Sequence, residues 1–486
     1  GMSMAPAARV VVVGGGIAGL TAAYRLQQIG RATGAEIQVL LLEGSDRLGG
    51  KIRTERAGEL VIEAGPDSFL SRKPAGIGLA AELGLTSRMI GTQPSGEGTF
   101  ILRGDHLEPL PEGITMLVPT KLRPLLRSGL LSTRGKLRMA LDLIIPPRPG
   151  NDDETVGAFI RRRFGDEAFE RMAQPLLSGI FAGDADQLSL LATHPQLRDI
   201  ERRYGSLIRG MLVERKRPPA PLPPGAPDAP FVSFTDGMAE LIEALVVALD
   251  RVDIRFESPV AALQLTGDGY DVRLMSGEEL ATDAVILATP AFVTADLVTP
   301  LDGEMATLLR QIPYASSATI TMAFRRQDVE RQGGGRGFVV PHVEDREITA
   351  VTWVTSKFAH RAPDDIVLLR AFVGRAGRDW AIELNDDALL QIVRAELERM
   401  TGLYAEPLTT SIFRWRRAMP QYVVGHLTRL ARIDERMLAL PNLYLAGAAY
   451  RGVGIPDCIE SGNNAALAVA AGLGLLARAR PAAAGH

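Results

Sequence analysis

The chain of 486 residues has a single cysteine, Cys458, and only 5% of its residues are aromatic. One cysteine cannot form an internal disulfide or a cysteine-rich metal site, so the sequence is compatible with a reducing compartment. An excess of one charge is also missing. There are 54 Lys and Arg residues against 57 Asp and Glu, a formal net charge of -3, whereas a dedicated nucleic-acid binder is normally basic.

Long hydrophobic runs are absent as well. The longest uncharged stretches, 10–24 and 461–477, are broken by glycines or polar residues, and a membrane-spanning helix needs about 18 apolar residues. No targeting segment stands out. We therefore expect a cytoplasmic protein, which could still sit on the inner face of a membrane. The length suggests two or three domains.

Metal-ligand spacing is missing among the histidines, so no metal site is expected. The six histidines are scattered along the chain: His106, His194, His342, His360, His426 and His486.

Glycine, by contrast, is abundant, and three of the 50 glycines form a motif. The β-branched run at 9–13 predicts a buried strand. Gly14-x-Gly16-x-x-Gly19 then opens a helix, and 37–42 predicts a second strand that ends at Glu43. This order predicts a βαβ unit with a right-handed crossover.

Each glycine of the motif has a physical role in dinucleotide binding. The first permits the tight turn, the second lets a pyrophosphate approach the backbone, and the third lets the helix pack on the strand. The free amides and partial positive charge of the helix N-terminus favour phosphates. Glu43 can accept hydrogen bonds from ribose hydroxyls and would repel a 2′-phosphate.

The rest of the sequence alternates helical and strand patterns. Residues 113–211 are mostly helical in pattern, and 216–230 is a proline-rich connection with seven prolines. Further predicted elements are a hairpin over 260–265 and 270–275, a buried strand over 283–290, a strand-rich segment over 315–372, a helix over 386–400, a strand over 442–446 and a final helix from about Cys458.

A second glycine pair suggests which dinucleotide is bound. Arg47-Leu48-Gly49-Gly50-Lys51 resembles the FAD-binding signature of the amine-oxidase-like flavoprotein superfamily. The polar turn at 63–68 suits backbone contact with a flavin edge. A glycine-rich loop at 447–457 runs into the final helix, whose N-terminus would stabilise negative charge on a reduced flavin.

More specific blocks resemble the protoporphyrinogen and coproporphyrinogen oxidase family, in particular its soluble Gram-positive-type branch. The blocks occur in family order over nearly the whole chain: GPDSFL at 65–70, GDE at 165–167, QPLLSGIFAGD at 174–184, MPQY at 419–422 and AYRGVGIPDC at 449–458.

The resemblance implies an α/β and α+β fold in three interleaved parts. A discontinuous Rossmann-type FAD domain would comprise 5–95, 225–300 and 425–486. A mixed-sheet substrate domain would comprise 96–112 and 301–424. A helical, membrane-associating domain would cover 113–215, followed by the linker 216–230.

The resemblance also implies non-covalent FAD and the oxidation of a porphyrinogen to the porphyrin, with oxygen as acceptor and hydrogen peroxide as by-product, in haem biosynthesis. No catalytic side chain is assigned. The implied FAD contacts are Gly14, Gly15, Gly16, Ile17, Ala18, Gly19, Glu43, Gly50, Lys51, Gly65, Pro66, Asp67, Ser68, Val260, Trp415, Val453, Gly454 and Ile455.

The substrate carries propionates, so cations should lie near the mouth of its site. Arg72 and Lys73 are the candidates, Lys73 being favoured by family position, and solvated surface cations are the alternative. Residues 114–146 interleave six cations and one acid with leucines, which is typical of a segment that lies on a membrane. An ordinary bundle helix with its polar face in water is the alternative there.

The sequence leaves two alternative functions. Another enzyme of the superfamily, such as an amine oxidase or carotenoid desaturase, and a flavin-holding scaffold without turnover are the competing functions. Coproporphyrinogen III is favoured over protoporphyrinogen IX by the terminal block alone. The oligomeric state and partner enzymes of the haem pathway are not predicted from sequence.

Overall fold

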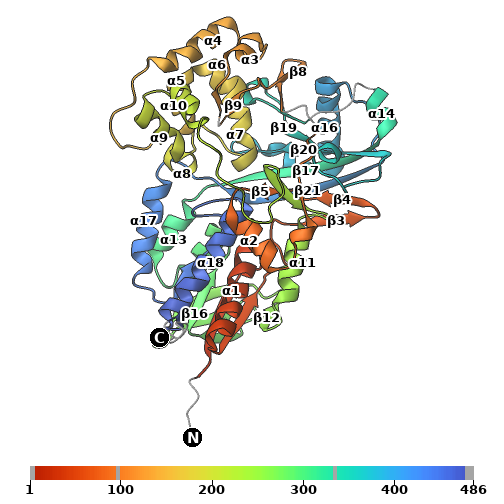
Figure 1. Cartoon of the computed structure of the whole chain (residues 1–486). Coiled ribbons are helices and arrows are strands. Elements are labelled where there is room, and N and C mark those ends of the chain that lie inside the picture. The colour runs from red at the N-terminus through yellow and green to blue at the C-terminus, as the bar shows by residue number, and fades with distance from the viewer. Residues whose placement is uncertain (1–5, 95–98, 116, 332–336, 477–486) are drawn as a thin grey trace, which may run out of the picture.

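A parallel five-stranded sheet forms the lower half of the molecule in Figure 1. The computed structural model describes residues 6–94, 99–115, 117–331 and 337–476. The strands lie in the order β12–β2–β1–β16–β22, and their bounds are Val252–Arg255, Ile37–Leu42, Ala8–Val13, Ala284–Leu287 and Leu443–Leu445. The predicted βαβ unit and the predicted strands before 290 and 446 are confirmed.

Both faces of this sheet are covered, which explains its β-branched strands. Val10 and Val12 pack on one face and Val11 and Val13 on the other. The first face carries α1 (Ile17–Thr33), α2 (Pro74–Glu82), α11 (Ala239–Ala248) and α18 (Ile455–Gly472). The second carries α12 (Ala291–Val298), α13 (Gly303–Arg310), α17 (His426–Met437) and the antiparallel sheet β13–β14–β15 (Val260–Leu265, Tyr270–Leu274 and Glu279–Thr282).

A mixed seven-stranded sheet lies above the parallel one (Figure 1). Its order is β21–β17–β20–β19–β18–β7–β8, with bounds Thr409–Pro420, Tyr314–Arg325, Ile366–Val373, Ile348–Trp353, Phe338–Val339, Phe100–Arg103 and His106–Pro109. Only β18 and β7 pair in parallel. The predicted helix, α16 (Asp386–Thr401), packs through Leu389, Val393 and Leu397 on this sheet.

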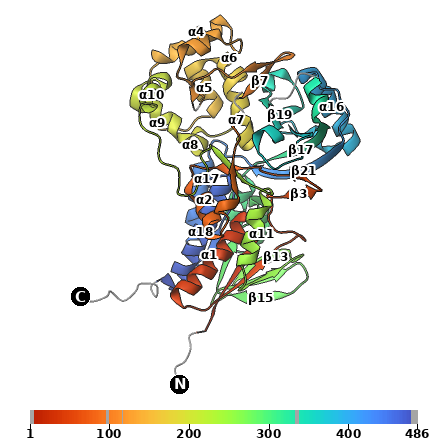
Figure 2. The same ribbon diagram turned by 45° about the vertical axis from the view of Figure 1, so that its right-hand side comes forward.

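Short helices occupy most of 122–214 and form the upper part of Figure 2. They are α3 (Leu122–Arg127), α4 (Thr133–Ala140), α5 (Val156–Phe164), α6 (Asp166–Ala168), α7 (Gln174–Phe181), α8 (Leu190–Thr193), α9 (Pro195–Tyr204) and α10 (Leu207–Glu214). A short hairpin, β9 (Ile114–Thr115) and β10 (Val118–Pro119), precedes them. Within 216–230 the structure has no helix or strand, and β11 (Phe231–Phe234) follows.

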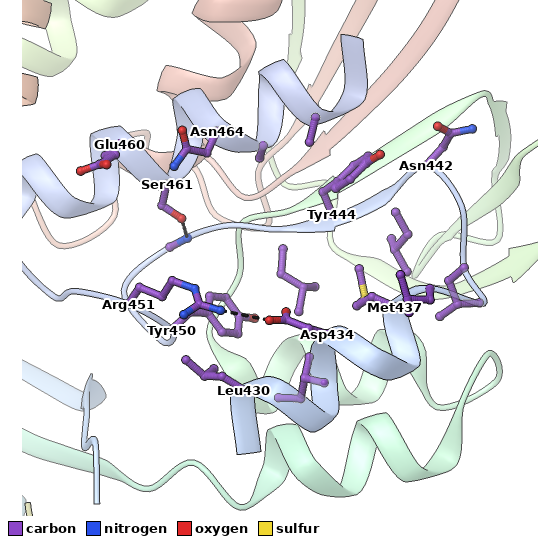
Figure 3. A pocket seen from close by; sticks show the side chains of 18 of the residues that line it. Leu430, Asp434, Met437, Asn442, Tyr444, Tyr450, Arg451, Glu460, Ser461 and Asn464 are labelled. Carbon is purple, nitrogen blue, oxygen red and sulfur yellow. Dashed lines mark hydrogen bonds and ion pairs between the residues drawn. The ribbon is translucent and has the colours of Figure 1, made fainter. Parts of the chain in front are cut away.

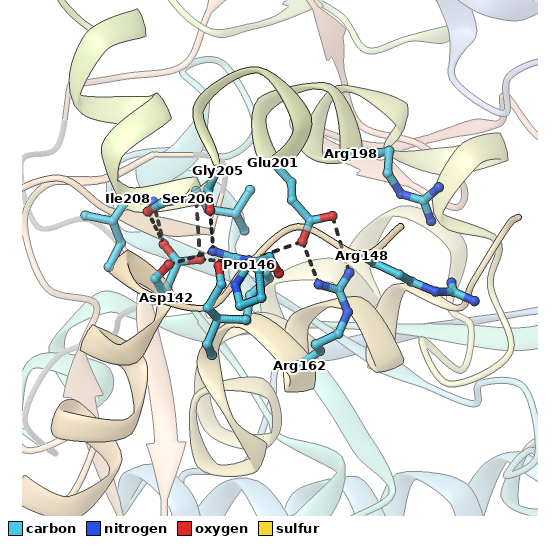
Figure 4. Close-up of polar contacts among 12 residues, drawn as sticks. Asp142, Pro146, Arg148, Arg162, Arg198, Glu201, Gly205, Ser206 and Ile208 are labelled. Carbon is cyan, nitrogen blue, oxygen red and sulfur yellow. Dashed lines mark hydrogen bonds and ion pairs between the residues drawn. The ribbon is translucent and has the colours of Figure 1, made fainter. Parts of the chain in front are cut away.

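Buried charge ties these helices together (Figure 4). The Arg163 guanidinium lies 2.6 Å from Asp142 Oδ1 and 3.3 Å from Glu201 Oε2, and all three side chains are inaccessible to solvent. Ser206 Oγ donates to the second oxygen of Asp142 at 2.6 Å. The network joins the turn after α4 to α5, α9 and α10.

α1 and α18 pack against each other on the first face of the parallel sheet, where the eighth residue of α18, Gly462, meets the second residue of α1, Ala18. A Cβ atom at Gly462 would be 2.4 Å from the Ala18 carbonyl oxygen, so only glycine allows this close helix contact. None of the helices in the described part of the chain is both long and apolar enough to cross a bilayer.

Candidate functional site

The turn into α1 depends on glycine for steric reasons. Gly14 has φ +106°, and a Cβ there would be 2.4 Å from the Ala288 oxygen. A Cβ at Gly19 would be 1.9 Å from the Gly14 oxygen. The helix that follows has no side-chain cap and no acid in its first turn, so its first amides are available to an anion.

Glu43 lies directly beside this turn. Its Oε1 accepts a hydrogen bond from Gly15 N at 2.9 Å and its Oε2 accepts one from Ser45 N at 2.8 Å. The Glu43 carbonyl accepts from Ser258 N at 2.9 Å, which brings the start of β13 and the buried Val260 to the same place. The carboxylate is thus oriented by backbone amides, and each oxygen keeps a further lone pair for a ribose hydroxyl.

The glycine pair Gly49–Gly50 packs against the Gly14–Gly19 turn. Gly49 N donates to the Gly15 oxygen at 2.8 Å, and a Cβ at Gly50 would be 3.2 Å from Gly16 Cα. Side chains at these positions would fill the space in front of the α1 N-terminus. Lys51 follows, and burial lowers the pKa of its ammonium group.

The turn at 63–68 is held by side chains of the seven-stranded sheet and α15 (Val354–Lys357). Arg370 donates to the oxygens of Glu63 and Gly65, both at 2.8 Å. Trp415 Nε1 donates to the Ala64 oxygen at 2.7 Å, and Lys357 Nζ lies 2.9 Å from Asp67 Oδ2. Trp415 is thereby brought to the predicted flavin edge.

Two carboxyl groups of this turn differ in their protonation. Burial opposes ionisation of Asp67, but Lys357 and Arg370 outweigh burial and hold the pKa of Asp67 well below its ordinary value. Burial raises the pKa of Glu63 to about 7, although hydrogen bonds from Thr54 and Met238 partly offset it. Glu63 Oε2 has no hydrogen-bond partner among the described residues.

The glycine-rich loop at 447–454 is bonded on several sides. Gly447 N donates to Ser461 Oγ at 2.9 Å, and Gly452 N donates to the Tyr422 hydroxyl at 2.8 Å. Tyr422 in turn donates to the Ala448 oxygen. Gly454 caps α18 without a side-chain hydrogen bond, and Asp457 lies in the first turn of this helix.

The two predicted substrate cations have different surroundings. Lys73 Nζ lies 2.9 Å from Asp457 Oδ1 and 3.0 Å from Oδ2, at the start of α18. Its side chain is 43% exposed. Arg72 is exposed, with no ion pair to another residue that the structure describes. Only Lys73 therefore touches another part of the predicted site.

A cavity of about 620 Å³ lies on the outer side of the 447–454 loop, between α17, β22 and α18 (Figure 3). Gly447, Gly452 and Asp457 line one end, and the Arg451–Asp434 ion pair crosses it at 3.0 Å. None of Gly14–Gly19, Glu43 or Lys51 lines it. The cavity is thus separate from the predicted cofactor contacts.

Cys458 is a buried thiol whose sulfur lies 3.9 Å from the Val453 oxygen. Burial raises the pKa of Cys458 to about 12, so the group is a neutral thiol at physiological pH. The described residues contain no cluster of His, Cys, Asp and Glu suited to a metal, and His486 lies outside them.

Sequence reasoning gave no role to the side chains of Arg370, Lys357 and His426, and it treated Glu63 only as part of the polar turn at 63–68. Arg370 interrupts the apolar run of β20, and Glu63 ends the short strand β4 (Leu60–Glu63). A charged residue within a strand pattern was therefore the feature of the sequence that could have identified both. Lys357 carried no local signal, because it meets Asp67 across 290 positions. His426 lies only four residues after Tyr422, the ring on which it stacks.

These features fit FAD. The cradle combines two helix N-termini without side-chain caps, Gly16, where a built Cβ would make only a van der Waals contact with Gly50 Cα at 3.9 Å, and an acid held by backbone amides. Phosphates, a flavin ring and ribose hydroxyls are the groups that such donors and acceptors recognise.

Comparison with known proteins agrees with this geometry. The family model of flavin-containing amine oxidoreductases matches residues 17–470. The chain is 36% identical to the coproporphyrinogen III oxidase of Bacillus subtilis, over 94% of this chain and 96% of that protein. It is 35% identical to the protein of that name from Staphylococcus aureus, over 96% and 99%.

A solved structure from Exiguobacterium sp. 255-15, provisionally assigned as a protoporphyrinogen oxidase, has 36% identity and a TM-score of 0.85 and covers 98% of this chain and 100% of its own. The expected mixed α/β flavoprotein fold is confirmed. The chain belongs to the flavin-containing amine oxidoreductase family and, within it, to the porphyrinogen oxidases.

Proposed function

We propose that this protein is an FAD-dependent oxidase that converts coproporphyrinogen III to coproporphyrin III in haem biosynthesis. The observation that carries the proposal is the identity of 36% over almost the full length of a coproporphyrinogen III oxidase. Six electrons and six protons leave the substrate, and three molecules of oxygen take them up as three of hydrogen peroxide. Protoporphyrinogen IX is the alternative substrate.

The residues of the cradle would bind FAD without a covalent bond. The α1 N-terminus and Gly14–Gly19 would bind the pyrophosphate, and Glu43 the ribose. Val260 would lie on the adenine side, while Gly50, Lys51, Gly65–Ser68, Trp415 and Val453–Ile455 would surround the flavin. Bound FAD supplies a hydride acceptor. The high pKa of the Cys458 thiol argues against a covalent link there.

The role of the chain is to hold the ring and the substrate in register. Arg370 and Trp415 of the seven-stranded sheet and Lys357 of α15 fix the turn at 63–68. The α18 N-terminus would stabilise negative charge near the flavin. We expect the same interleaved division into an FAD part, a substrate part and a helical part, with the strands of the parallel sheet drawn from distant segments.

Lys73 and Arg72 would attract the substrate propionates. Lys73 is half exposed and its three N–H donors are not all used by Asp457. A lysine beside the flavin loop and open to solvent suits an anchor at the mouth of a site.

Anaerobic mixing with each porphyrinogen tests the function. We expect coproporphyrinogen III to bleach the flavin absorbance and produce porphyrin fluorescence, and readmitted oxygen to yield peroxide. The same measurement with protoporphyrinogen IX decides which porphyrinogen is preferred. If neither porphyrinogen reduces the flavin, an amine oxidase, a desaturase or a flavin-holding scaffold becomes the better description.

We also propose that the protein is cytoplasmic and lies peripherally on anionic membranes through 114–146. Three apolar side chains of this segment are largely exposed: Leu122 (69%), Leu137 (66%) and Ile144 (77%). Arg123, Arg127 and Arg134 are exposed among them. Apolar side chains interleaved with cations, at the end of the molecule opposite the termini (Figure 1), suit an anionic lipid surface.

A further inference from the structure

The 419–424 segment lies where three parts of the molecule meet. Gln421 N donates to the Pro313 oxygen at 2.8 Å, next to the seven-stranded sheet. Gln421 Nε2 donates to the Phe181 oxygen of α7 at 2.6 Å. Ser189 N donates to the Tyr422 oxygen at 2.7 Å. Tyr422 is therefore fixed through its own carbonyl and through the adjacent Gln421, independently of its contacts with the glycine-rich loop.

The Tyr422 hydroxyl holds that loop at two points. It donates to the Ala448 oxygen and accepts from Gly452 N, so one side chain joins the two arms of the loop. The ring is 2% exposed. A loop rich in glycine has many accessible conformations, and this bond pair selects one of them.

His426 supports Tyr422 from the opposite side. The two rings stack with centroids 4.2 Å apart and an interplanar angle of 14°. His426 Nε2 lies 2.7 Å from the Tyr450 oxygen, and since a carbonyl can only accept, Nε2 carries the proton. Nδ1 is buried without a partner among the described residues, as expected for the neutral ring.

We propose that Tyr422 and His426 are a positioning pair that holds the 447–454 loop in the shape that binds the flavin, and so set flavin affinity and redox potential. The inference rests on the proposed flavin function. Neither residue touches the reacting atoms. The pair acts through Ala448, Tyr450 and Gly452, which precede the N-terminus of α18.

The test compares Tyr422→Phe and His426→Phe with the control Tyr270→Phe. Tyr270 is equally buried, at 1% exposure, and its hydroxyl also donates to a backbone oxygen, that of Pro441 at 2.8 Å. The control therefore loses a comparable hydrogen bond without touching the loop. The readouts are the FAD dissociation constant, the flavin midpoint potential and the visible flavin spectrum.

We expect Tyr422→Phe to weaken FAD binding about tenfold, because Gly452 N loses its partner. The midpoint potential should become more negative, since the amides near the flavin would be less well ordered. His426→Phe keeps the stacked ring and should shift both values in the same direction by less. In the double variant the effects should be less than additive, because both act on one loop.

The proposal is overturned if Tyr422→Phe and Tyr270→Phe change FAD affinity and potential equally while the thermal midpoints of the two variants agree. In that outcome a wild-type protein that binds FAD and oxidises porphyrinogen leaves the proposed function intact. A wild-type protein that binds no FAD overturns both.

Discussion

Glu63 is a carboxyl group in a place from which water is excluded. It is 4% exposed, and one of its oxygens has no partner among the described residues. Ionising a carboxyl group there requires removing its charge from water. The pKa of about 7 follows from that cost, even with two hydrogen bonds and two arginines nearby.

The raised pKa of Glu63 predicts a pH dependence of stability. Above the ordinary carboxyl pKa of 4.5 the unfolded chain releases the proton, whereas the folded chain retains it up to about pH 7. The contribution of Glu63 to stability therefore falls between these values and is level outside them. Glu63→Gln keeps the acceptor for Thr54 and Met238 but does not titrate.

We expect Glu63→Gln to gain stability over the wild type as pH rises from 4.5 to 7, by ~3 kcal/mol in all, since each pKa unit corresponds to about 1.4 kcal/mol. Urea unfolding of both proteins at pH 4 and pH 8 measures this. A difference between the proteins that does not change with pH would show that Glu63 is ionised when buried.

Lys73 predicts an effect on substrate binding. We expect Lys73→Ala to raise KM about tenfold at unchanged FAD content, because one charge-assisted contact to a propionate is lost. The partner it leaves, Asp457, lies in the first turn of α18, where the helix dipole tolerates a negative charge.

Lys121→Ala is the matched control for that measurement, since Lys121 is another exposed lysine paired with one acid, Glu112. Unchanged steady-state kinetics of Lys73→Ala would remove Lys73 from the substrate contacts.

At the scale of elements, the contact between Gly462 and Ala18 holds α18 against α1. Gly462→Ala would place a Cβ 2.4 Å from the Ala18 oxygen. We expect this variant to lose ~1–3 kcal/mol of unfolding free energy and to bind FAD more weakly, because the helices must separate.

Gly78→Ala is the control for Gly462→Ala. Gly78 lies inside α2 with no atom within 4 Å of a built Cβ, so alanine should stabilise the protein by about 0.5–1 kcal/mol through helix propensity. Equal unfolding midpoints of the two variants would contradict a close contact between α1 and α18.

The buried network of Figure 4 makes a second prediction about elements. Arg163→Ala leaves Asp142 and Glu201 buried without their common partner, and we expect a loss of ~3–5 kcal/mol in denaturant unfolding. Arg25→Ala breaks a partly exposed pair with Glu82 and should cost less than about 1 kcal/mol. Similar losses in both variants would mean that burial does not govern the strength of the network.

At the scale of the whole molecule, the exposed apolar side chains of 114–146 and the proposed FAD-binding residues lie in different parts of the structure. We expect the protein to co-sediment with phosphatidylglycerol vesicles and to be released by high salt. The variant with Leu122→Ser, Leu137→Ser and Ile144→Ser should bind about tenfold less while its FAD content is unchanged.

Val247→Ser is the control for vesicle binding, because Val247 is 81% exposed but lies on α11, away from residues 114–146. Absence of co-sedimentation even with fully anionic vesicles would count against a membrane role and favour an ordinary helical bundle with its polar face in water.

Much of the local structure was predictable. The strand at Ile37–Leu42 and the pair over 260–274 are found as expected, because alternation and β-branching act over a few residues. The turn into α1 was predictable for a similar reason, since a positive φ at Gly14 and the contact at Gly19 require glycine within a few positions.

Contacts between distant segments were not predictable. Arg370 meets Gly65 across 305 positions and Lys73 meets Asp457 across 384. The exposure of Leu122 and Leu137, beside the buried Leu130 and Leu131, also depends on which surfaces the neighbouring helices cover.

By itself, the sequence determined the kind of ligand, because the glycine spacing and the strand-ending acid satisfy steric and hydrogen-bonding needs that are local in the chain. Only the tertiary structure decided how the site is held. The loop at 447–454 takes its shape from Tyr422 and His426, and the turn at 63–68 takes its own from Arg370, Trp415 and Lys357. Such bonds form only when folding brings separate segments within reach, and a linear pattern does not record that distance.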